Sequence, residues 1–257
     1  METTHYLPAL GRTAADVIGA RPAAGDRAWT LLTGFHQLDA LLGGLRPGQL
    51  VVVASRPGDG KSSFARGLAE RVAVDQHQPT LFFSLETPAE DVVALMACAR
   101  ARVGVARQLA GRVDDAERLL LAQVSQRIAR APLFVDDSAD LSTAHVRERA
   151  RVARRDRAIE LVIVDGVRLL QPPDFGFVAA QLKAMAMELK IPVVATAPVA
   201  GGIGETADAV VVLAREAAHG GMPSLCDAAV MKNRTGPSGA AQLAFLPEYA
   251  RFENLPG

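Results

Sequence analysis

The sequence predicts an α/β domain in which a mostly parallel sheet with a mixed edge is flanked by helices and followed by a C-terminal β-hairpin. From Trp29 onward, short apolar runs alternate with amphipathic segments, which is typical of parallel strands joined by crossover helices. Near the end of the chain, two strand-like segments flank T-G-P-S-G, a turn sequence. With 49% hydrophobic and 22% charged residues, the chain of 257 residues can bury a sizeable core.

Each predicted element follows from its local pattern. The apolar runs predict strands at Leu50–Ala54, Thr80–Leu85, Leu133–Val135, Leu161–Val164, Val193–Thr196 and Ala209–Leu213. Helical periodicity between them predicts helices at Lys61–Val74, Ala89–Arg102, Asp114–Arg130, Thr143–Arg155 and Val178–Leu189. Asp114 and Ser142 are favourable N-cap residues for two of these helices. The hairpin strands are expected at Asp227–Lys232 and Ala240–Leu246.

Residues 1–28 differ in composition from the rest of the chain. They are rich in Ala, Gly, Arg and Pro, and we expect a flexible arm or linker with one short helix around Thr13–Ala20. Residues 29–257 are expected to form one domain, because they contain no internal repeat and no low-complexity tract.

Composition excludes several classes of protein. The formal net charge is zero, so bulk charge cannot hold the chain on nucleic acid. Cys98 and Cys226 stand in unrelated contexts and form neither a disulfide framework nor a zinc pattern. The N-terminus lacks the basic and apolar regions of a signal peptide, and no apolar run can span a bilayer. We therefore expect a soluble cytoplasmic protein without a membrane partner.

The stretch S-R-P-G-D-G-K-S-S lies between an apolar strand and a helical segment. Gly58 and Gly60 let the backbone turn its N–H groups inward, so the loop and the helix N-terminus together make an anion site. Lys61 can hold terminal phosphates, and the Ser62 hydroxyl can ligate Mg²⁺. Ser55 stands where the usual phosphate loop has its first glycine. The alternative, an ordinary glycine-rich turn, is disfavoured by G-K-S at this place. We expect nucleotide binding through Ser55, Arg56, Pro57, Gly58, Asp59, Gly60, Lys61, Ser62 and Ser63.

Two carboxylates follow predicted strands. Asp165 ends L-V-I-V-D, where ATPases with such a loop carry their second Mg²⁺ contact. Because ligands collect at the carboxyl ends of parallel strands, we expect Asp165 and Lys61 to lie at the same edge of the sheet. Glu86 ends F-F-S-L-E and can orient and deprotonate an attacking water molecule there. On strand chemistry alone, a helix-capping role for Glu86 before Pro88 is equally well supported.

These motifs lie within longer stretches that resemble one family. The chain resembles the C-terminal, RecA-like ATPase domain of DnaB-type replicative helicases. The family's own phosphate loop begins with Ala or Ser followed by Arg-Pro, which accounts for Ser55. The matching stretches run in the family's order over nearly all of residues 29–257, and they are L-T-G-F-H-Q-L-D-A-L-L-G-G-L-R-P-G-Q-L, S-R-P-G-D-G-K-S, F-F-S-L-E, A-P-L-F-V-D-D-S-A-D-L-S, L-V-I-V-D, L-K-A-M-A-M-E-L-K-I-P-V, M-K-N-R-T-G-P-S-G and L-A-F-L-P-E-Y-A-R-F-E-N-L.

The resemblance implies a role for each matching residue near the phosphate loop. Lys61 would hold the phosphates, and Ser62 and Asp165 would hold Mg²⁺. Glu86 would be the catalytic carboxylate, which favours a catalytic over a capping role. Arg215, in the short match L-A-R-E, would lie near the nucleotide base. The implied cofactors are ATP and Mg²⁺.

The resemblance also implies a catalytic pair that acts between subunits. Lys232 and Arg234 match a Lys-x-Arg pair that reaches the γ-phosphate held by a neighbouring subunit. Residues two apart on a strand share a face, so both cations can converge on one phosphate. The implied assembly is a homo-oligomeric ring or filament in which Arg234 acts in trans. Without the resemblance, a solvated hairpin edge would be the better interpretation of this pair.

The chain departs from the family in three places. Pro198 stands where the family has a glutamine that senses the γ-phosphate and couples it to DNA, and proline has no side-chain amide. Only G-G-I-G-E precedes T-A-D-A-V-V-V-L, in place of a long loop with an Arg-Glu-Ser-Gly segment that touches single-stranded DNA. The stretch after Asp165 is also shorter than the family's DNA-side loop, and Arg168 is one cation left near it. The family's N-terminal domain is absent from this sequence.

The arginine-rich segment V-R-E-R-A-R-V-A-R-R-D-R invites a nucleic-acid interpretation. It places Arg147, Arg151 and Arg154 on one helical stripe. Glu148 and Asp156 interrupt the stripe, and no aromatic residues interleave for base stacking. We therefore expect a solvated outer helix face.

The function that we expect is that of a DnaB-like ATPase domain. It binds ATP·Mg²⁺, hydrolyses ATP in DNA replication or a related DNA transaction, binds single-stranded DNA weakly and unwinds DNA poorly, with a replication or mobile-element protein as a candidate partner. One alternative is a non-enzymatic nucleotide-binding switch or regulatory paralogue, which measured turnover would distinguish. The other is a KaiC-like or RadA-like ATPase with other partners, against which the ending Y-A-R-F-E-N-L counts.

Overall fold

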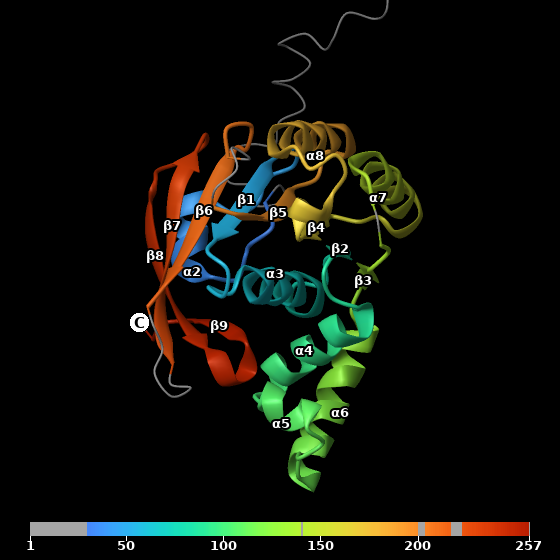
Figure 1. Cartoon of the computed structure of the whole chain (residues 1–257), viewed down its shortest axis with the longest axis vertical. Coiled ribbons are helices and arrows are strands. Elements are labelled where there is room, and N and C mark those ends of the chain that lie inside the picture. Colours follow the sequence, from blue (N-terminus) through green and yellow to red (C-terminus); the bar gives the residue numbers. More distant parts are fainter. Residues whose placement is uncertain (1–29, 140, 200–203, 217–222, 257) are drawn as a thin grey trace, which may run out of the picture.

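The computed structural model describes residues 30–139, 141–199, 204–216 and 223–256. Within these ranges, nine strands form one sheet in the order β3-β2-β4-β5-β1-β6-β7-β8-β9. The pairs from β3 to β6 are parallel, and the three pairs from β6 to β9 are antiparallel. The predicted α/β class, with a parallel sheet that has a mixed edge, is therefore confirmed (Figure 1).

The strands follow the apolar runs of the sequence closely. They are β1 Leu50–Ser55, β2 Thr80–Ser84, β3 Leu133–Asp136, β4 Leu161–Asp165, β5 Val193–Pro198, β6 Ala209–Arg215, β7 Ser224–Asn233, β8 Gly239–Leu246 and β9 Arg251–Asn254. The predicted hairpin is confirmed as β7 and β8, although β7 begins earlier than expected. The short strand β9 was not predicted.

The helices confirm five predictions and add two short helices. The predicted helices are α3 Lys61–Glu70 with its continuation η2 Arg71–Asp75, α4 Ala89–Ala101, α6 Asp115–Arg130, α7 Thr143–Arg157 and α8 Phe175–Leu189. The short helices α2 His36–Leu42 and α5 Val105–Leu109 were not predicted. Asp114 and Ser142 each form a capping box at the start of their helix, as the sequence indicated.

The sheet is covered on both faces, which is why its central strands are apolar along their whole length. Successive residues of β1 point into different cores: Val51 and Val53 join the one that contains α3, whereas Val52 and Ala54 join the one that contains α8. In Figure 1, α7 and α8 lie on one side of the sheet and α3 lies on the other. Helices α4, α5 and α6 extend from the sheet as a lobe. Among the described residues, no helix has the length and apolar character needed to cross a membrane.

Some predictions concern residues that the structure does not describe. The expected arm at residues 1–28, with its helix around Thr13–Ala20, lies outside the described ranges. The same is true of residues 200–203, which make up much of the short segment between β5 and β6.

Candidate functional site

The glycine-rich loop joins β1 to α3 at the carboxyl edge of the sheet. Gly58 and Gly60 have φ angles of 87° and 97°, a region that residues with a side chain rarely adopt. Gly60 is also the N-cap residue of α3, and a Cβ atom there would lie 3.0 Å from the Phe252 ring. Both glycines are therefore required by the backbone path. Arg56, Pro57 and Gly58 are exposed, so the loop is open to an anion from solvent.

Ser55 explains how the loop begins without a glycine. It is fully buried as the last residue of β1, and its hydroxyl donates a 2.8 Å hydrogen bond to the carbonyl oxygen of Arg56. Its neighbours in the sheet register are Pro198 on β5 and Leu213 on β6. The residue therefore anchors the loop inside the sheet, and the turn itself is made at Gly58 and Gly60.

The structure brings Ser62 and Asp165 together, as the sequence predicted. The Ser62 hydroxyl donates to Oδ1 of Asp165 at 3.1 Å, from the first turn of α3 to the end of β4. The Thr196 hydroxyl on β5 donates to the same oxygen at 2.6 Å and accepts from the Gly166 N–H at 2.8 Å. Asp165 is only 4% exposed. Burial raises the pKa of its carboxyl, and the Thr196 and Ser62 hydrogen bonds offset only part of that rise.

This donor set fits Mg²⁺. Magnesium in nucleotide sites takes one or two protein oxygens and completes its shell with phosphate oxygens and water. Ser62 and Asp165 offer a hydroxyl and a carboxylate at the foot of an anion-binding loop. A buried carboxylate that has no cationic hydrogen-bond partner among the described residues gains most from such an ion.

Glu86 lies beside this cluster, two residues beyond the end of β2. Its Oε1 atom accepts a 2.9 Å hydrogen bond from Nε of Arg168, which follows β4. The capping alternative is wrong, because the Ala89 N–H at the start of α4 donates instead to Asp137 at 2.8 Å. The neighbouring charge of Glu86 contributes to the raised pKa of Asp165, after burial. Glu86 therefore lies at the same edge as the loop and close to the metal-binding candidates.

Arg215 ends β6 at this edge of the sheet. Its guanidinium lies 4.6 Å from the centre of the Phe245 ring, and Phe245 also approaches Gly60 of the loop. The structure thus holds Arg215 next to the glycine-rich loop, where the predicted contact with the nucleotide base requires it.

Lys232 and Arg234 lie at the opposite end of the sheet. Lys232 pairs with Val210 near the start of β6, whereas Ser55 at the loop pairs with Leu213 near its end. Val210 lies three residues before Leu213, and Asp208, whose carbonyl oxygen accepts from the Arg234 N–H, lies five residues before it. Lys232 and Arg234 are therefore roughly 10 Å and 17 Å from the loop along the strand direction. The two cations therefore lie well away from the glycine-rich loop of their own chain.

Both cations point toward the segment that precedes β6. Lys232 Nζ donates to the carbonyl oxygens of Gly204 at 3.0 Å and Glu205 at 2.6 Å. Arg234 approaches the buried Asp208 at 3.4 Å, a carboxylate that Lys183 contacts at 2.7 Å. The Arg234 side chain is 51% exposed and leaves most of its donors for another partner.

Comparison with known proteins assigns the family. The profile of the family described as "DnaB-like helicase C terminal domain" matches residues 30–200. The chain belongs to this family. Among its relatives is the protein named replicative DNA helicase DnaB of Haemophilus influenzae, which is 33% identical over 87% of this chain and 55% of its own length. The protein of the same name from Leifsonia xyli subsp. xyli is 31% identical with the same coverage. The chain thus spans little more than half the length of these relatives.

Solved structures show the same fold at lower identity. A structure described as an ATPase domain superposes with a TM-score of 0.79 at 23% identity, covering 87% of this chain and 90% of its own. A DnaB-like replicative helicase, described together with its interactions with primase, superposes with a TM-score of 0.82 at 21% identity, covering 96% of this chain and 67% of its own. The predicted resemblance to DnaB-type ATPase domains is confirmed.

Pro198 occupies a sensitive place in this DnaB-like domain. It ends β5 and pairs in register with Ser55, so it lies directly beside the start of the glycine-rich loop. A side chain with an amide at this place would lie next to the loop, whereas proline offers neither an amide nor an N–H group. The strand register therefore places the proline that departs from the family pattern directly beside the loop.

The arginine side chains of helix α7 form ion pairs on the surface of the DnaB-like domain. Arg147 and Arg151 both bond Glu188 on α8, and Arg154 donates to the carbonyl oxygen of Ile159 at 2.6 Å. Because these guanidinium groups are already partnered and partly exposed, the helix agrees with the predicted solvated face.

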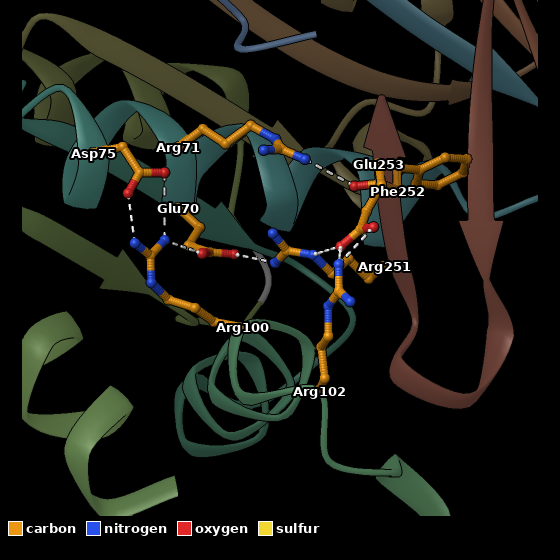
Figure 2. A network of polar contacts seen from close by, with 8 residues as sticks. All are labelled: Glu70, Arg71, Asp75, Arg100, Arg102, Arg251, Phe252 and Glu253. Atoms are coloured by element: carbon orange, nitrogen blue, oxygen red, sulfur yellow. Dashed lines mark hydrogen bonds and ion pairs between the residues drawn. The ribbon is translucent and has the colours of Figure 1, made fainter. Parts of the chain in front are cut away.

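The far end of α3 is anchored by a network of charged groups (Figure 2). Glu70 is 2% exposed and lies between Arg100 of α4 and Arg251 of β9. Arg251 also contacts Glu253 at 2.9 Å, and Glu253 contacts Arg102 at 2.8 Å. The helix that begins at the glycine-rich loop is thereby joined to the helical lobe and to the last strand.

Sequence reasoning missed the role of Thr196 and placed Arg168 only near the DNA-side loop. The threonine in the apolar run V-V-A-T-A was the available signal, because a hydroxyl in a buried strand needs a partner, and Thr196 is indeed fully buried. No sequence pattern indicated that Arg168 would contact Glu86, since the two are 82 positions apart.

Proposed function

We propose that this DnaB-like domain binds and hydrolyses ATP with Mg²⁺ and serves DNA replication or a related DNA transaction. The contact between Ser62 and Asp165 carries the proposal, because it joins the glycine-rich loop to the carboxyl end of β4. Glu86 lies beside that contact and supports hydrolysis over binding alone. Relatives named replicative DNA helicase DnaB support the setting in DNA replication.

Each group at this edge has a chemical role in the proposal. The loop N–H groups and Lys61 bind the phosphates of ATP, and Ser62 and Asp165 hold Mg²⁺. The bound Mg²⁺ would supply charge neutralisation at the phosphate oxygens. Glu86 accepts the proton of the attacking water through a carboxylate oxygen. Arg215, beside the loop, contacts the nucleotide at its base end.

Hydrolysis is proposed to need a second copy of the chain. Lys232 and Arg234 lie at the edge away from their own loop, so they can contact a γ-phosphate only across a subunit interface. The proposed assembly is a homo-oligomeric ring or filament, in which each loop meets the Lys232 and Arg234 of a neighbour. Residues 1–28 are proposed to be an arm outside the domain.

A partner protein and weak binding of single-stranded DNA complete the proposal. One solved relative is described with its interactions with primase, which supports a replication protein as the kind of partner. A non-hydrolysing switch is the second candidate. The ion pair that occupies one oxygen of Glu86 is the observation in its favour.

Nucleotide binding is tested by thermal unfolding with and without ATP·Mg²⁺. Ligand that binds only the folded state raises its stability by about 2.7 kcal/mol at a hundredfold excess over Kd. Lys61→Ala should lose most of that gain. Lys190→Ala is the matched control, because Lys190 is exposed at the end of α8. An equal ATP-dependent shift in wild type and Lys61→Ala would overturn the loop assignment.

Hydrolysis is tested by turnover. Glu86→Gln keeps the size of the side chain but removes its ability to accept a proton, so it should bind ATP as the wild type does and release phosphate at least ~100-fold more slowly. Phosphate release is measured at saturating ATP. A wild type that binds ATP without turnover would establish the switch instead.

A further inference from the structure

A tight turn carries Arg168 from the end of β4 to the end of β2. Asp165 ends β4, Gly166 follows with a φ angle of 94°, and Val167–Leu169 form a 3₁₀ turn closed by a 2.9 Å hydrogen bond from Leu169 N to Gly166 O. Strands β4 and β2 are neighbours, and Leu85 N donates to Asp165 O at 3.1 Å. Arg168 and Glu86 therefore follow the ends of two adjacent strands, and their side chains meet there.

Gly166 makes room for this meeting. A Cβ atom at residue 166 would lie 3.0 Å from Cγ of Glu86 and 3.1 Å from its Oε1. Because glycine has no Cβ, the Glu86 side chain can lie directly against the backbone of the turn. Its Oε1 atom thereby lies against Gly166 and accepts the hydrogen bond from the Arg168 guanidinium.

The same turn is fixed to the metal-binding candidates. Gly166 N donates to Thr196, Thr196 donates to Asp165, and Ser62 donates to Asp165 as well. Arg168 is thus mounted on backbone whose position is set by the hydrogen bonds that hold Asp165. Arg168 therefore links the position of Glu86 to that of Asp165.

The contact between Arg168 and Glu86 uses only one carboxylate oxygen. Nε of Arg168 donates to Oε1 at 2.9 Å, and Oε2 has no hydrogen-bond donor among the residues that the structure describes. A bidentate guanidinium would occupy both oxygens. The Glu86 side chain is 34% exposed, so without this partner it would be free to change rotamer.

We propose that Arg168 is a positioning residue for the general base: it holds Oε1 of Glu86 and leaves Oε2 to accept the proton of the attacking water. The inference rests on the proposed hydrolysis of ATP with Glu86 as the base. A displacement of about 1 Å in such a group can cost on the order of 100-fold in rate.

The test compares steady-state turnover of wild type, Arg168→Ala and Arg168→Lys, with Arg155→Ala as the control. Arg155 is an exposed arginine of α7 in an ion pair with Asp156, away from the loop. We expect Arg168→Ala to lower kcat roughly 10- to 100-fold with an unchanged KM for ATP. Arg168→Lys should recover part of the loss, and guanidinium ion at tens of millimolar should recover part of it in Arg168→Ala.

A double-mutant cycle separates positioning of Glu86 from any other role. Arg168→Ala placed on Glu86→Gln should cause no further loss of kcat, because a residue that acts through Glu86 has nothing left to position. Losses that multiply would overturn the proposal, as would an unchanged or raised kcat in Arg168→Ala while the wild type turns over. A raised KM alone would make Arg168 a nucleotide contact and would also overturn it. If the wild type shows no turnover, the proposed function itself fails, and the inference fails with it.

Discussion

The hydroxyl of Ser62 lies 3.1 Å from the carboxylate of Asp165, although 103 positions separate them in the sequence. One residue begins a helix after β1 and the other ends β4, and the sheet order β4-β5-β1 brings them within reach. The only donors to Oδ1 of Asp165 within the described ranges are hydroxyls. A buried carboxylate partnered only by neutral donors is costly for the fold.

Asp165→Asn should separate stability from Mg²⁺ binding. The amide oxygen can still accept from Ser62 and Thr196, so the ligand-free variant should melt at or above the wild-type temperature. The extra stabilisation by ATP that depends on Mg²⁺ should be lost. Thermal unfolding with ATP, in the presence and absence of Mg²⁺, checks both points, and Asp156→Asn on the surface is the control.

The stability difference between wild type and Asp165→Asn should also depend on pH. Burial raises the pKa of Asp165, so the unfavourable charge is present above that raised pKa and disappears as the pH falls through it. The ligand-free difference between wild type and Asp165→Asn should therefore shrink as the pH is lowered toward the ordinary carboxyl range. A difference that grows on acidification would contradict this account.

Mixing two inactive variants should restore hydrolysis. Arg234→Ala lacks the cation that acts across the interface, and Lys61→Ala lacks a working loop, so a mixed assembly contains some complete sites. An arginine finger is worth about 10³ to 10⁵ in rate, so each variant alone should be nearly inactive. Phosphate release is measured against protein concentration and mixing ratio. Absence of rescue, together with activity independent of concentration, would indicate a site complete within one chain.

Glu70 should be the most sensitive charge of the network in Figure 2. It is 2% exposed between Arg100 and Arg251, and its removal leaves these partly buried guanidinium groups with only Asp75 and Glu253 as partners. Glu70→Ala should lower the free energy of unfolding by about 1.5 to 3 kcal/mol. Glu253→Ala, which removes a more exposed carboxylate that contacts Arg102 and Arg251, should cost less, about 1 kcal/mol. Urea unfolding measures both, and equal costs would contradict the network.

The sequence was sufficient to predict those elements that are buried along their whole length. Runs such as L-V-I-V-D are apolar on both faces because the sheet is covered twice, so β1, β4 and their neighbours could be predicted almost to the residue. Strand β9 was missed because four residues, R-F-E-N, show no clear alternation, and α2 and α5 are too short for helical periodicity.

The residues of the candidate site can likewise be divided into those that the sequence predicts and those that it does not. Lys61, Ser62 and Asp165 could be placed because each follows a recognisable strand in a local motif. The ion pair of Arg168 with Glu86 could not, since it depends on a turn geometry that only Gly166 permits. Nor could the burial of Thr196 against Asp165, which depends on the neighbouring strands β4 and β5 being in register.

We expect coupling between ATP and DNA to be weak in this domain. Unwinding needs a nucleotide site, a grip on single-stranded DNA and a residue that connects the two. Pro198 lies beside Ser55 at the start of the loop and offers no polar group there. Arg168, which the sequence analysis placed near the DNA-side loop, already forms an ion pair with Glu86.

The isolated protein should therefore be a poor helicase. Contacts to the phosphate backbone supply much of the affinity for single strands, and a chain of zero net charge has no bulk charge to replace missing loops. We expect weak binding to an oligonucleotide with a shallow salt dependence, less than about twofold stimulation of ATPase by single-stranded DNA, and slight displacement of a forked duplex. Fluorescence anisotropy, phosphate release and strand displacement measure these three quantities. A glutamine at position 198, as Pro198→Gln, should raise the stimulation if the missing amide is the cause. Robust unwinding by the wild type, with ATPase strongly stimulated by single-stranded DNA, would show instead that grip and coupling are supplied by other residues of this chain.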